Sequence, residues 1–400
     1  MIIVLHLTNF NQNLEAAPMY VWRAIQGYEL RVDMSRSEGA PNMGVISFGL
    51  IGGGWRAEFY LRIARAMPER FAVGSVYVRN KDKAEEMRRK WGVKVHTSLE
   101  AFLSAGGYSF AVLCLKREAS MEYMIRVAEA GVPLLAETPP APDLDQLIQL
   151  WNTVGCSAVI QIAEQYLFQP MMAARMKLAA SGRLGNISQA QVSAAHGYHG
   201  ISLIRKFLDI RFENAAIRAQ GFGSSIMNGP QRSGPPSGEE WVRTEQTLAT
   251  LDFGGRLGVY DFTRDQYFSW IRASRLLVRG DRGEIMNDEV SWLESYDTPL
   301  YSQLRRIDAG HGGNLEGLYL KGIMGDGEWL YRNPFAPARL TDEGLAMAES
   351  LERMQRHVEG GPSFYSLAEG SQDQYLSLLL EQAAASGETV TSATQPWAEV

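Results

Sequence analysis

One segment near the N-terminal end limits what this 400-residue chain can fold into. Residues 45–57 read V-I-S-F-G-L-I-G-G-G-W-R-A, a continuous apolar run that leads directly into a glycine-rich turn. Such a run is typical of a strand buried on both faces, and the amphipathic residues 58–67 predict a helix after it. In a dinucleotide site Gly52 would permit the tight turn, Gly54 would let the backbone approach a pyrophosphate, and Ala57 would let helix and strand pack closely. The strand–turn–helix order therefore predicts a dinucleotide site, although an ordinary glycine-rich loop can have the same letters.

The composition excludes several classes of protein. The chain is 46% hydrophobic, which is enough for substantial cores in two or three domains. Its formal net charge of −6 argues against a nucleic-acid-binding protein, which usually needs a basic surface. No run of apolar residues is long enough to predict a membrane span. We interpret the two cysteines, Cys114 and Cys156, as core residues, and with neither a disulfide framework nor metal-ligand spacing we expect a cytoplasmic protein without a metal.

The first residues differ in character from the rest. Residues 33–42 are polar and rich in turn formers, and Met43 stands immediately before the first convincing strand. The apolar start, residues 1–5, lacks the basic residues and the length of a secretory signal. We expect residues 1–42 to form a poorly ordered extension, or to result from a start codon assigned too far upstream.

Strand-like and helix-like segments alternate from residue 45 to residue 162. The expected strands are 45–51, 71–78, 93–95, 110–115, 132–136 and 158–162, and the expected helices are 58–67, 81–91, 98–103, 119–130 and 143–153. This alternation predicts an α/β domain over residues 43–163, a Rossmann doubly wound parallel sheet with ligands at the carboxyl ends of its strands.

The pattern changes after residue 163. Strand-like stretches at 186–195, 243–253, 256–264, 274–280 and 283–286 are separated by glycine-rich turns, and helices are expected at 170–181, 201–208 and after Thr341 and Ser366. Gly254-Gly255 is a strong hairpin signal, whereas residues 228–240 have the composition of a mobile loop. We expect a second, C-terminal α+β domain over residues 164–392, with an antiparallel sheet and the C-terminal helices.

An ordered set of motifs resembles the Gfo/Idh/MocA family of NAD(P)-dependent oxidoreductases. Besides the glycine turn, the set comprises V-P-L-L-A-E-T-P-P at 132–140, S-G-R-L-G-N-I-S at 181–188, G-Y-H-G-I-S-L-I at 197–204, L-V-R-G-D-R-G-E-I at 277–285 and G-E-T-V at 387–390. The resemblance covers residues 44–392. It implies that the second domain has an open, mostly antiparallel sheet that binds substrate and pairs chains into a homodimer or homotetramer.

The departures from the family pattern concern the catalytic groups. The lysine of the family's Glu-Lys-Pro motif, which hydrogen-bonds the substrate hydroxyl, is replaced by Thr138. A threonine carries no charge and is not an effective base near pH 7. The family's catalytic helix often has two acids, and here these positions are Ala195 and Ser202 while the histidine, His199, is kept.

His199 is the strongest candidate for the proton donor or acceptor, because imidazole titrates near physiological pH. The alternative is that this histidine only packs at a helix start. Tyr198 and Thr138 would orient the substrate. Lys116, at a neighbouring strand end, could replace the missing lysine, or it could be an ordinary exposed lysine. The catalytic candidates are therefore His199, Tyr198, Thr138 and Lys116.

Three further residues are candidates for substrate contacts. His196 shares the turn with His199, and Tyr166 lies on the expected crossover between the domains. His311 stands in a polar glycine-rich segment that often borders the site in the family. The alternatives are packing at a helix start for His196, a core position for Tyr166 and a surface position for His311.

The cofactor would lie along several strand ends. The candidate contacts are Gly52, Gly54, Trp55, Arg56, Ala57, Arg79, Asn80, Leu115 and Glu137. NAD enzymes usually place an acid at the end of the second strand to bind the ribose 2′-hydroxyl, and Val78 takes that place here. Because the cation Arg79 follows, we expect NADP to be favoured over NAD, although Arg79 could stack on the adenine of either.

Three functions are consistent with these residues. The first is an NAD(P)-dependent oxidoreductase that acts on a sugar, polyol, inositol or related cyclic compound. The second is a glycosidase-type enzyme that uses tightly held NAD for transient oxidation and elimination, as in family branches that lack the usual lysine. The third is a non-catalytic, nucleotide-sensing regulatory protein. We expect a carbohydrate-like small molecule as the partner, and neither nucleic acid nor a membrane.

Overall fold

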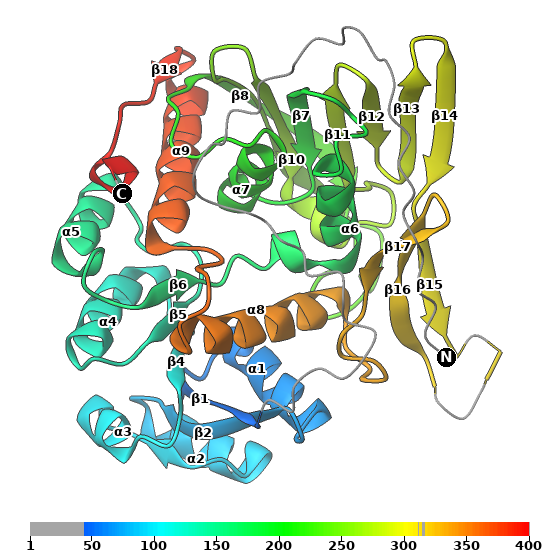
Figure 1. Cartoon of the computed structure of the whole chain (residues 1–400). Helices are drawn as coiled ribbons and strands as arrows, with labels where there is room; N and C mark the ends of the chain where they lie inside the picture. The colour runs from blue at the N-terminus through cyan, green and yellow to red at the C-terminus, as the bar shows by residue number, and fades with distance from the viewer. Residues whose placement is uncertain (1–43, 311, 314–316, 400) are drawn as a thin grey trace, which may run out of the picture. The chain divides into compact units, whose positions relative to one another are not determined.

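The computed structural model describes residues 44–310, 312–313 and 317–399, and Figure 1 shows the arrangement of their helices and strands. The extension expected over residues 1–42 and the candidate His311 lie outside the described residues. Each helix in the described part of the chain is too short or too polar to cross a bilayer.

Residues 44–162, all of them described, form a six-stranded parallel sheet in the order β3-β2-β1-β4-β5-β6. Its strands are β1 (Ile46–Ile51), β2 (Phe71–Tyr77), β3 (Val95–His96), β4 (Phe110–Leu113), β5 (Leu134–Ala136) and β6 (Ile160–Ile162). The connecting helices are α1 (Trp55–Ala66), α2 (Lys81–Trp91), α3 (Leu99–Ala105), α4 (Arg117–Glu129) and α5 (Leu144–Val154). The strands β4, β5 and β6 are buried throughout, as continuous apolar strands covered on both faces should be. This strand order is that of a Rossmann fold, so the predicted doubly wound sheet is confirmed.

The two cysteines differ from one another. Cys114 is buried at the end of β4, as expected. Cys156 is exposed, so its assignment to the core was wrong. The reason is that α5 ends at Val154 and the chain turns through residues 155–158 before β6 begins, which leaves the thiol on the outside of the turn.

After residue 163 the described residues form a second, nine-stranded sheet in the order β14-β13-β12-β11-β7-β10-β9-β8-β18. Its strands are β7 (Ile187–Ser193), β8 (Ala216–Met227), β9 (Trp241–Asp252), β10 (Leu257–Thr263), β11 (Arg275–Gly280), β12 (Gly283–Met286), β13 (Glu289–Ser295), β14 (Thr298–Gln303) and β18 (Val390–Thr391). Strands β7 and β10 pair in parallel and their neighbours pair antiparallel, so the expected mostly antiparallel sheet is confirmed. A smaller sheet contains β15 (Arg305–Ala309), β16 (Tyr319–Gly325) and β17 (Glu328–Arg332).

The hairpin expected at Gly254-Gly255 joins β9 to β10. Both glycines have positive φ angles, +73° and +108°, which side chains disfavour. Because the two residues turn the chain without a clash, β9 and β10 pair in register from Asp252 and Leu257 onward.

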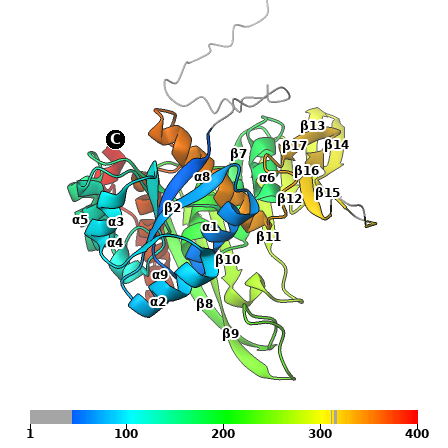
Figure 2. The same cartoon turned by 90° about the horizontal axis from the view of Figure 1, so that it is seen from below.

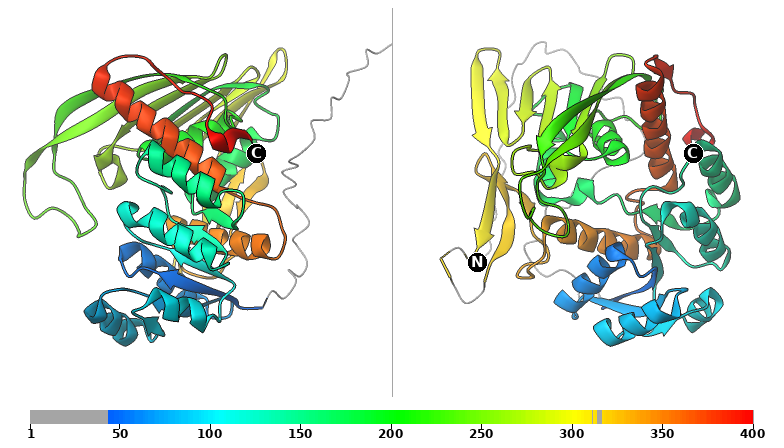
Figure 3. Two further views of the ribbon diagram at one scale, coloured as in Figure 1. Left: turned by 90° about the vertical axis from the view of Figure 1, so that its left-hand side faces the viewer. Right: turned by 180° about the vertical axis from the view of Figure 1, so that it is seen from behind.

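The described C-terminal part also contains the helices α6 (Pro170–Ala179), α7 (Gly197–Phe207), α8 (Asp342–Val358) and α9 (Leu367–Ser386). The predicted caps are confirmed, because the hydroxyls of Thr341 and Ser366 accept hydrogen bonds from backbone N–H groups of the first turns of α8 and α9. Helix α9 packs on α7 and lies along β8 of the large sheet (Figure 3). Helix α8 packs on α1, β1 and β4, so the chain returns to the Rossmann sheet after building the second one.

A buried ion pair fixes α7 against α9. The guanidinium of Arg205 lies 2.5 Å from Asp373, and neither side chain is exposed to solvent. Arg205 also donates to Glu369 at 3.1 Å, and the hydroxyl of Tyr365 donates to Asp373. Since α7 carries His199, this network holds the candidate catalytic helix in place.

We predict that Arg205→Met lowers the free energy of unfolding by about 3–5 kcal/mol, because it leaves the Asp373 carboxylate buried without its cation. Urea denaturation measures this directly. The control is Arg243→Met, which removes a 75% exposed arginine that pairs with Glu245 and should cost less than about 1 kcal/mol. Equal effects of the two substitutions would contradict the prediction.

Candidate active site

The glycine turn has the geometry that a phosphate-binding turn requires. Gly52 has a φ angle of +120°, and a Cβ there would lie 2.3 Å from the carbonyl oxygen of Cys114. Gly54, by contrast, would direct a Cβ into space with no atom within 4 Å. No side chain caps the N-terminus of α1, so its first N–H groups are available to an anion. The turn therefore fits the pyrophosphate of a dinucleotide.

The end of β2 lacks the acid found in many NAD enzymes. Val78 is buried there and lies under Gly53, where an added Cβ would be 2.8 Å from it. Arg79 is exposed, and Asn80 caps α2 by accepting a hydrogen bond from the backbone N–H of Lys83 at 2.8 Å. A cation is therefore available where the adenosine ribose would lie, without an adjacent carboxylate on the strand end.

Arg56 and Glu137, both expected to contact the cofactor, bind each other. The Arg56 Nε lies 3.3 Å from Glu137, and its Nη1 lies 2.6 Å from Glu343 at the start of α8. The hydroxyl of Tyr60 donates to Glu137 at 2.7 Å. Burial raises the pKa of Glu137, while the positive charge of Arg56 opposes that rise. Arg56 thus joins the glycine turn to β5 and to α8.

The chemical centre of the site is a buried pair that joins two elements far apart in sequence. Glu164 follows β6, and its Oε2 lies 2.5 Å from the Nδ1 of His199 on α7. The other ring nitrogen, Nε2, lies 3.5 Å from the hydroxyl of Thr138. His199 therefore links the buried carboxyl of Glu164 to Thr138, the residue at the position of the family's lysine.

Burial determines the protonation of this pair. It raises the pKa of Glu164 to about 8, against the opposing effects of the Tyr166 N–H and the Arg56 charge. It lowers the pKa of His199 to about 3, with a further contribution from Arg56. The imidazole is therefore neutral near pH 7, and Glu164 loses its proton only in mildly alkaline solution.

The Glu164 proton decides which hydrogen-bonding role Nε2 of His199 can take. When Glu164 is protonated it donates to Nδ1, so the neutral ring carries its proton on Nε2 and presents a donor to Thr138. When Glu164 is ionised it accepts from Nδ1–H, and Nε2 becomes an acceptor. One buried carboxyl can thus convert the same ring nitrogen from an acid into a base.

Aromatic rings and a second histidine surround the pair. The ring of Tyr166 lies 4.5 Å from that of His199, and the ring of His196 lies 4.7 Å from it, between centroids. The hydroxyl of Tyr267 accepts a hydrogen bond from the backbone N–H of His196 at 3.0 Å. Burial, with smaller electrostatic contributions from His199 and from the cations Arg117 and Arg264, lowers the pKa of His196 to about 3. The predicted substrate residues His196 and Tyr166 are thus brought next to His199.

The other two catalytic candidates are Tyr198, whose ring lies 5.2 Å from that of His199 between centroids, and Lys116. Tyr198 is buried, its hydroxyl faces Gly370 of α9, and it has no hydrogen-bond partner among the described residues. Lys116 is exposed at the N-terminus of α4, and Leu115 before it is half-buried. The structure therefore brings together His199, Thr138, His196 and Tyr166, whereas the side chain of Tyr198 points into the α7–α9 interface.

Sequence reasoning missed Glu164. The available signal was a carboxyl directly after a predicted buried strand, at the sheet edge where ligands bind. The large sheet supplies Tyr267, on the short helix η2 (Arg264–Tyr267), which also was not singled out. No group of three or more His, Cys, Asp or Glu residues within the described ranges is placed to hold a metal ion.

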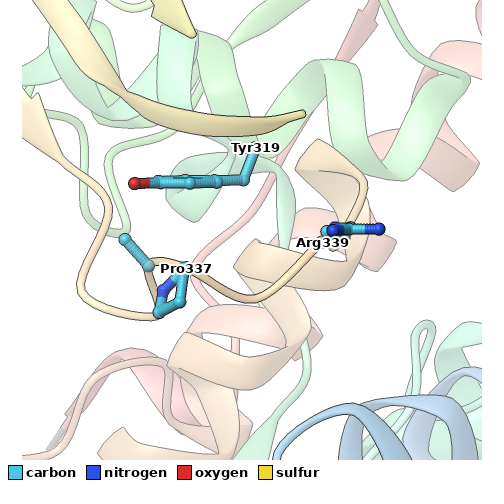
Figure 4. A pocket seen from close by; sticks show the side chains of 4 residues that line it. Tyr319, Pro337 and Arg339 are labelled. Carbon is cyan, nitrogen blue, oxygen red and sulfur yellow. The ribbon is translucent and has the colours of Figure 1, made fainter. Parts of the chain in front are cut away.

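A separate hollow lies at the start of β16, the central strand of the small sheet, and shares no residue with this site. Tyr319, Ala336, Pro337 and Arg339 line it, and Figure 4 shows the tyrosine ring above the loop that carries both Pro337 and Arg339. It lacks a buried acid–base pair such as Glu164 and His199. His199 is therefore kept as the candidate proton-transfer group.

Comparisons with known proteins agree with the fold. Residues 46–162 match the model of the Gfo/Idh/MocA oxidoreductase family, with its NAD-binding Rossmann fold, which confirms the predicted family resemblance. A comparison with curated proteins gives no significant match.

Several solved structures are similar over most of the chain. Levoglucosan dehydrogenase in complex with NADH and levoglucosan is 17% identical, with a TM-score of 0.62 over 86% of this chain and 99% of that chain. A putative myo-inositol dehydrogenase from Sinorhizobium meliloti is 16% identical, with a TM-score of 0.61 over 87% and 100%. An oxidoreductase from Agrobacterium radiobacter in complex with NAD+, L-tartaric acid and magnesium is 15% identical, with a TM-score of 0.59 over 86% and 98%. At these identities the likeness establishes the fold.

The raised pKa of Glu164 predicts a pH-dependent stability. The folded protein keeps the Glu164 proton up to about pH 8, whereas the unfolded chain loses it near pH 4.5. The contribution of this proton to the free energy of unfolding is therefore fully present below pH 4.5 and is lost as the pH rises through 8. Between these values the free energy of unfolding falls by about 1.4 kcal/mol per pH unit.

We predict that Glu164→Gln removes this contribution, so that its free energy of unfolding falls less steeply between pH 5 and pH 8 than that of the wild type. Urea denaturation at several pH values measures the difference. The exposed Glu388→Gln serves as control and should leave the slope unchanged. A wild-type slope in Glu164→Gln would show that the carboxyl titrates normally, contrary to the prediction.

Proposed function

We propose, starting from the membership of residues 46–162 in the Gfo/Idh/MocA family, that the protein is an NAD(P)-dependent oxidoreductase. Its substrate would be a hydroxyl or carbonyl compound such as a sugar, polyol, inositol or related cyclic molecule. The proposal depends most on the orientation of the His199 ring. Its Nδ1 is hydrogen-bonded to buried Glu164, and its Nε2 faces Thr138, which stands at the position of the family's lysine.

His199 would move the proton of the reaction. A nicotinamide cofactor, when bound, would supply the hydride acceptor for the oxidation of an alcohol. Nε2 of His199 accepts the hydroxyl proton, which requires ionised Glu164 on the opposite side of the ring. In the reduction of a carbonyl, Nε2 returns the proton when Glu164 is protonated. Thr138 holds the substrate oxygen near Nε2 but carries no charge itself.

The remaining groups would position the reactants. The turn at Gly52–Gly54 and the N-terminus of α1 would hold the pyrophosphate. Arg79 would bind a ribose 2′-phosphate, which supports a preference for NADP over NAD. Tyr166 and His196 would line the substrate space beside His199.

The assembly and location follow as part of the proposal. Large apolar side chains are exposed on strands of the nine-stranded sheet, among them Phe222, Trp241 and Tyr301. Pairing of chains through the open sheet, which the family resemblance implies, would cover side chains of this kind. We retain a homodimer or homotetramer as the expected assembly, and a cytoplasmic location as a separate expectation from the sequence.

The replacement of the lysine by Thr138 supports a second candidate, the glycosidase-type reaction. There the cofactor would stay bound, and His199 would remove a proton from the carbon next to the transiently oxidised one. A non-catalytic sensor would bind cofactor and convert nothing. Cofactor consumption during turnover separates the first two functions, and the absence of turnover favours the third.

The test is a kinetic comparison of His199→Asn and Glu164→Gln with the wild type, after NAD and NADP titrations and a screen of sugars, polyols and inositols. His199→Asn should lower kcat/KM about 10²- to 10⁴-fold, because it removes the proton-transfer group. His96→Asn, a histidine of β3 in the Rossmann sheet, is the control and should retain activity.

Glu164→Gln tests the positioning of the ring. Because the Tyr166 N–H donates to Oε1, the glutamine amide nitrogen would take the place of Oε2 and donate to Nδ1, which fixes the proton on Nε2. The rate of alcohol oxidation by the wild type should increase as the pH rises through about 8. Glu164→Gln should oxidise the alcohol slowly, and its rate should not show this increase with pH. An active His199→Asn variant would contradict the proposed role of the histidine.

A further inference from the structure

A second arginine lies at the glycine turn and comes from the second sheet. The segment 228–240 joins β8 to β9, and its ends are held by a hydrogen bond from the Asn228 N–H to the Glu240 carbonyl at 2.7 Å. At its tip Gln231 and Gly234 exchange two backbone hydrogen bonds of 2.9 and 3.0 Å, which places Arg232 at the corner of a tight turn. Figure 2 shows the β8–β9 hairpin projecting beyond the rest of the nine-stranded sheet.

Arg232 stacks on the first residue of α1. Its guanidinium carbon lies 3.7 Å from the ring centroid of Trp55, a distance typical of a close cation–π contact. Trp55 is 47% exposed and directly follows Gly54. The contact therefore bridges 177 positions of sequence and places a guanidinium on the ring of the residue that begins α1, directly after the glycine turn.

The charge of Arg232 is not neutralised within the described residues. The guanidinium of Arg56 also lies near the Trp55 ring, at 4.8 Å, but it is paired with Glu137 and Glu343. Arg232 forms no ion pair with any described residue, and its side chain is exposed. Of the two cations at Trp55, Arg232 is the one whose charge is available to an anion.

We propose that Arg232 binds the pyrophosphate of the dinucleotide and that the loop 228–240 closes over the bound cofactor. Stacking on the Trp55 ring fixes the orientation of the Arg232 guanidinium. A guanidinium can donate two parallel hydrogen bonds to phosphate oxygens. The N-terminus of α1 supplies N–H groups to the phosphates. Arg232 supplies a full positive charge from the loop between β8 and β9. Since the loop must open for release, Arg232 slows dissociation of the cofactor. This inference rests on the proposed nucleotide function.

The experiment measures binding of ADP-ribose, which contains the pyrophosphate but no nicotinamide, and of adenosine, which contains no phosphate. Calorimetric titrations compare the wild type, Arg232→Gln, Arg232→Lys and the control Arg243→Gln, which removes another exposed arginine of the same hairpin. Arg232→Gln should weaken ADP-ribose binding about 10- to 100-fold and leave adenosine binding within about twofold. Arg232→Lys should be intermediate, because it keeps the charge but not the two parallel donors, and Arg243→Gln should match the wild type.

The outcomes separate this inference from the proposed function. If the wild type binds ADP-ribose and Arg232→Gln binds it equally well, Arg232 does not contact the pyrophosphate and only this inference is overturned. Equal weakening of adenosine and ADP-ribose would also overturn it, because the effect would then be an indirect one on the fold of the site. If the wild type binds neither ADP-ribose nor NAD nor NADP, the proposed function itself fails. Faster release of ADP-ribose from Arg232→Gln than from the wild type, in stopped-flow measurements of tryptophan fluorescence, would support closure of the loop, and equal release rates would contradict it.

Discussion

The hydrogen bond between Glu164 and His199 is the constraint on which the rest of the site depends. Both groups are removed from water, so neither can hold its usual charge at low cost, and the pair shares protons in place of forming an ion pair. Burial raises the pKa of the carboxyl to about 8 and lowers the pKa of the imidazole to about 3. As a result, a single proton on Glu164 determines whether the opposite nitrogen of His199 donates or accepts. A chain that lacks the family's lysine can in this way retain a group able to move a proton near neutral pH.

The architecture holds the two partners in place from both sides. Glu164 follows the last strand of the Rossmann sheet, and its Oε1 accepts from the backbone N–H of Tyr166, which fixes the carboxyl plane. His199 lies in the first turn of α7, and Arg205 on the same helix is tied to Asp373 of α9 inside the second domain. Arg56 connects the glycine turn to Glu343 of α8. The acid–base pair is therefore positioned by contacts that join both sheets.

Much of this could be predicted from the sequence, and the missed side-chain partners have a common cause. The strand, turn and helix around Gly52 depend on neighbouring residues, so local patterns predicted them, and the parallel sheet followed from the alternation of elements. By contrast, the partners of Arg56, His199 and Trp55 lie from 35 to 287 positions away, and no local pattern contains such pairs. Strand β8 was missed because Gly221 and Gly223 interrupt its alternation. The orientation of Tyr198 into the α7–α9 interface likewise depends on packing that only the fold determines.

The most direct test is ¹⁵N NMR of histidine-labelled protein from pH 5 to pH 10, with His199→Asn used to assign the His199 signals. The proposed pair predicts a neutral ring throughout, protonated on Nε2 below about pH 8 and on Nδ1 above it, with the change absent in Glu164→Gln. An imidazolium signal for His199 near pH 6, or a tautomer that does not change through pH 8, would contradict it.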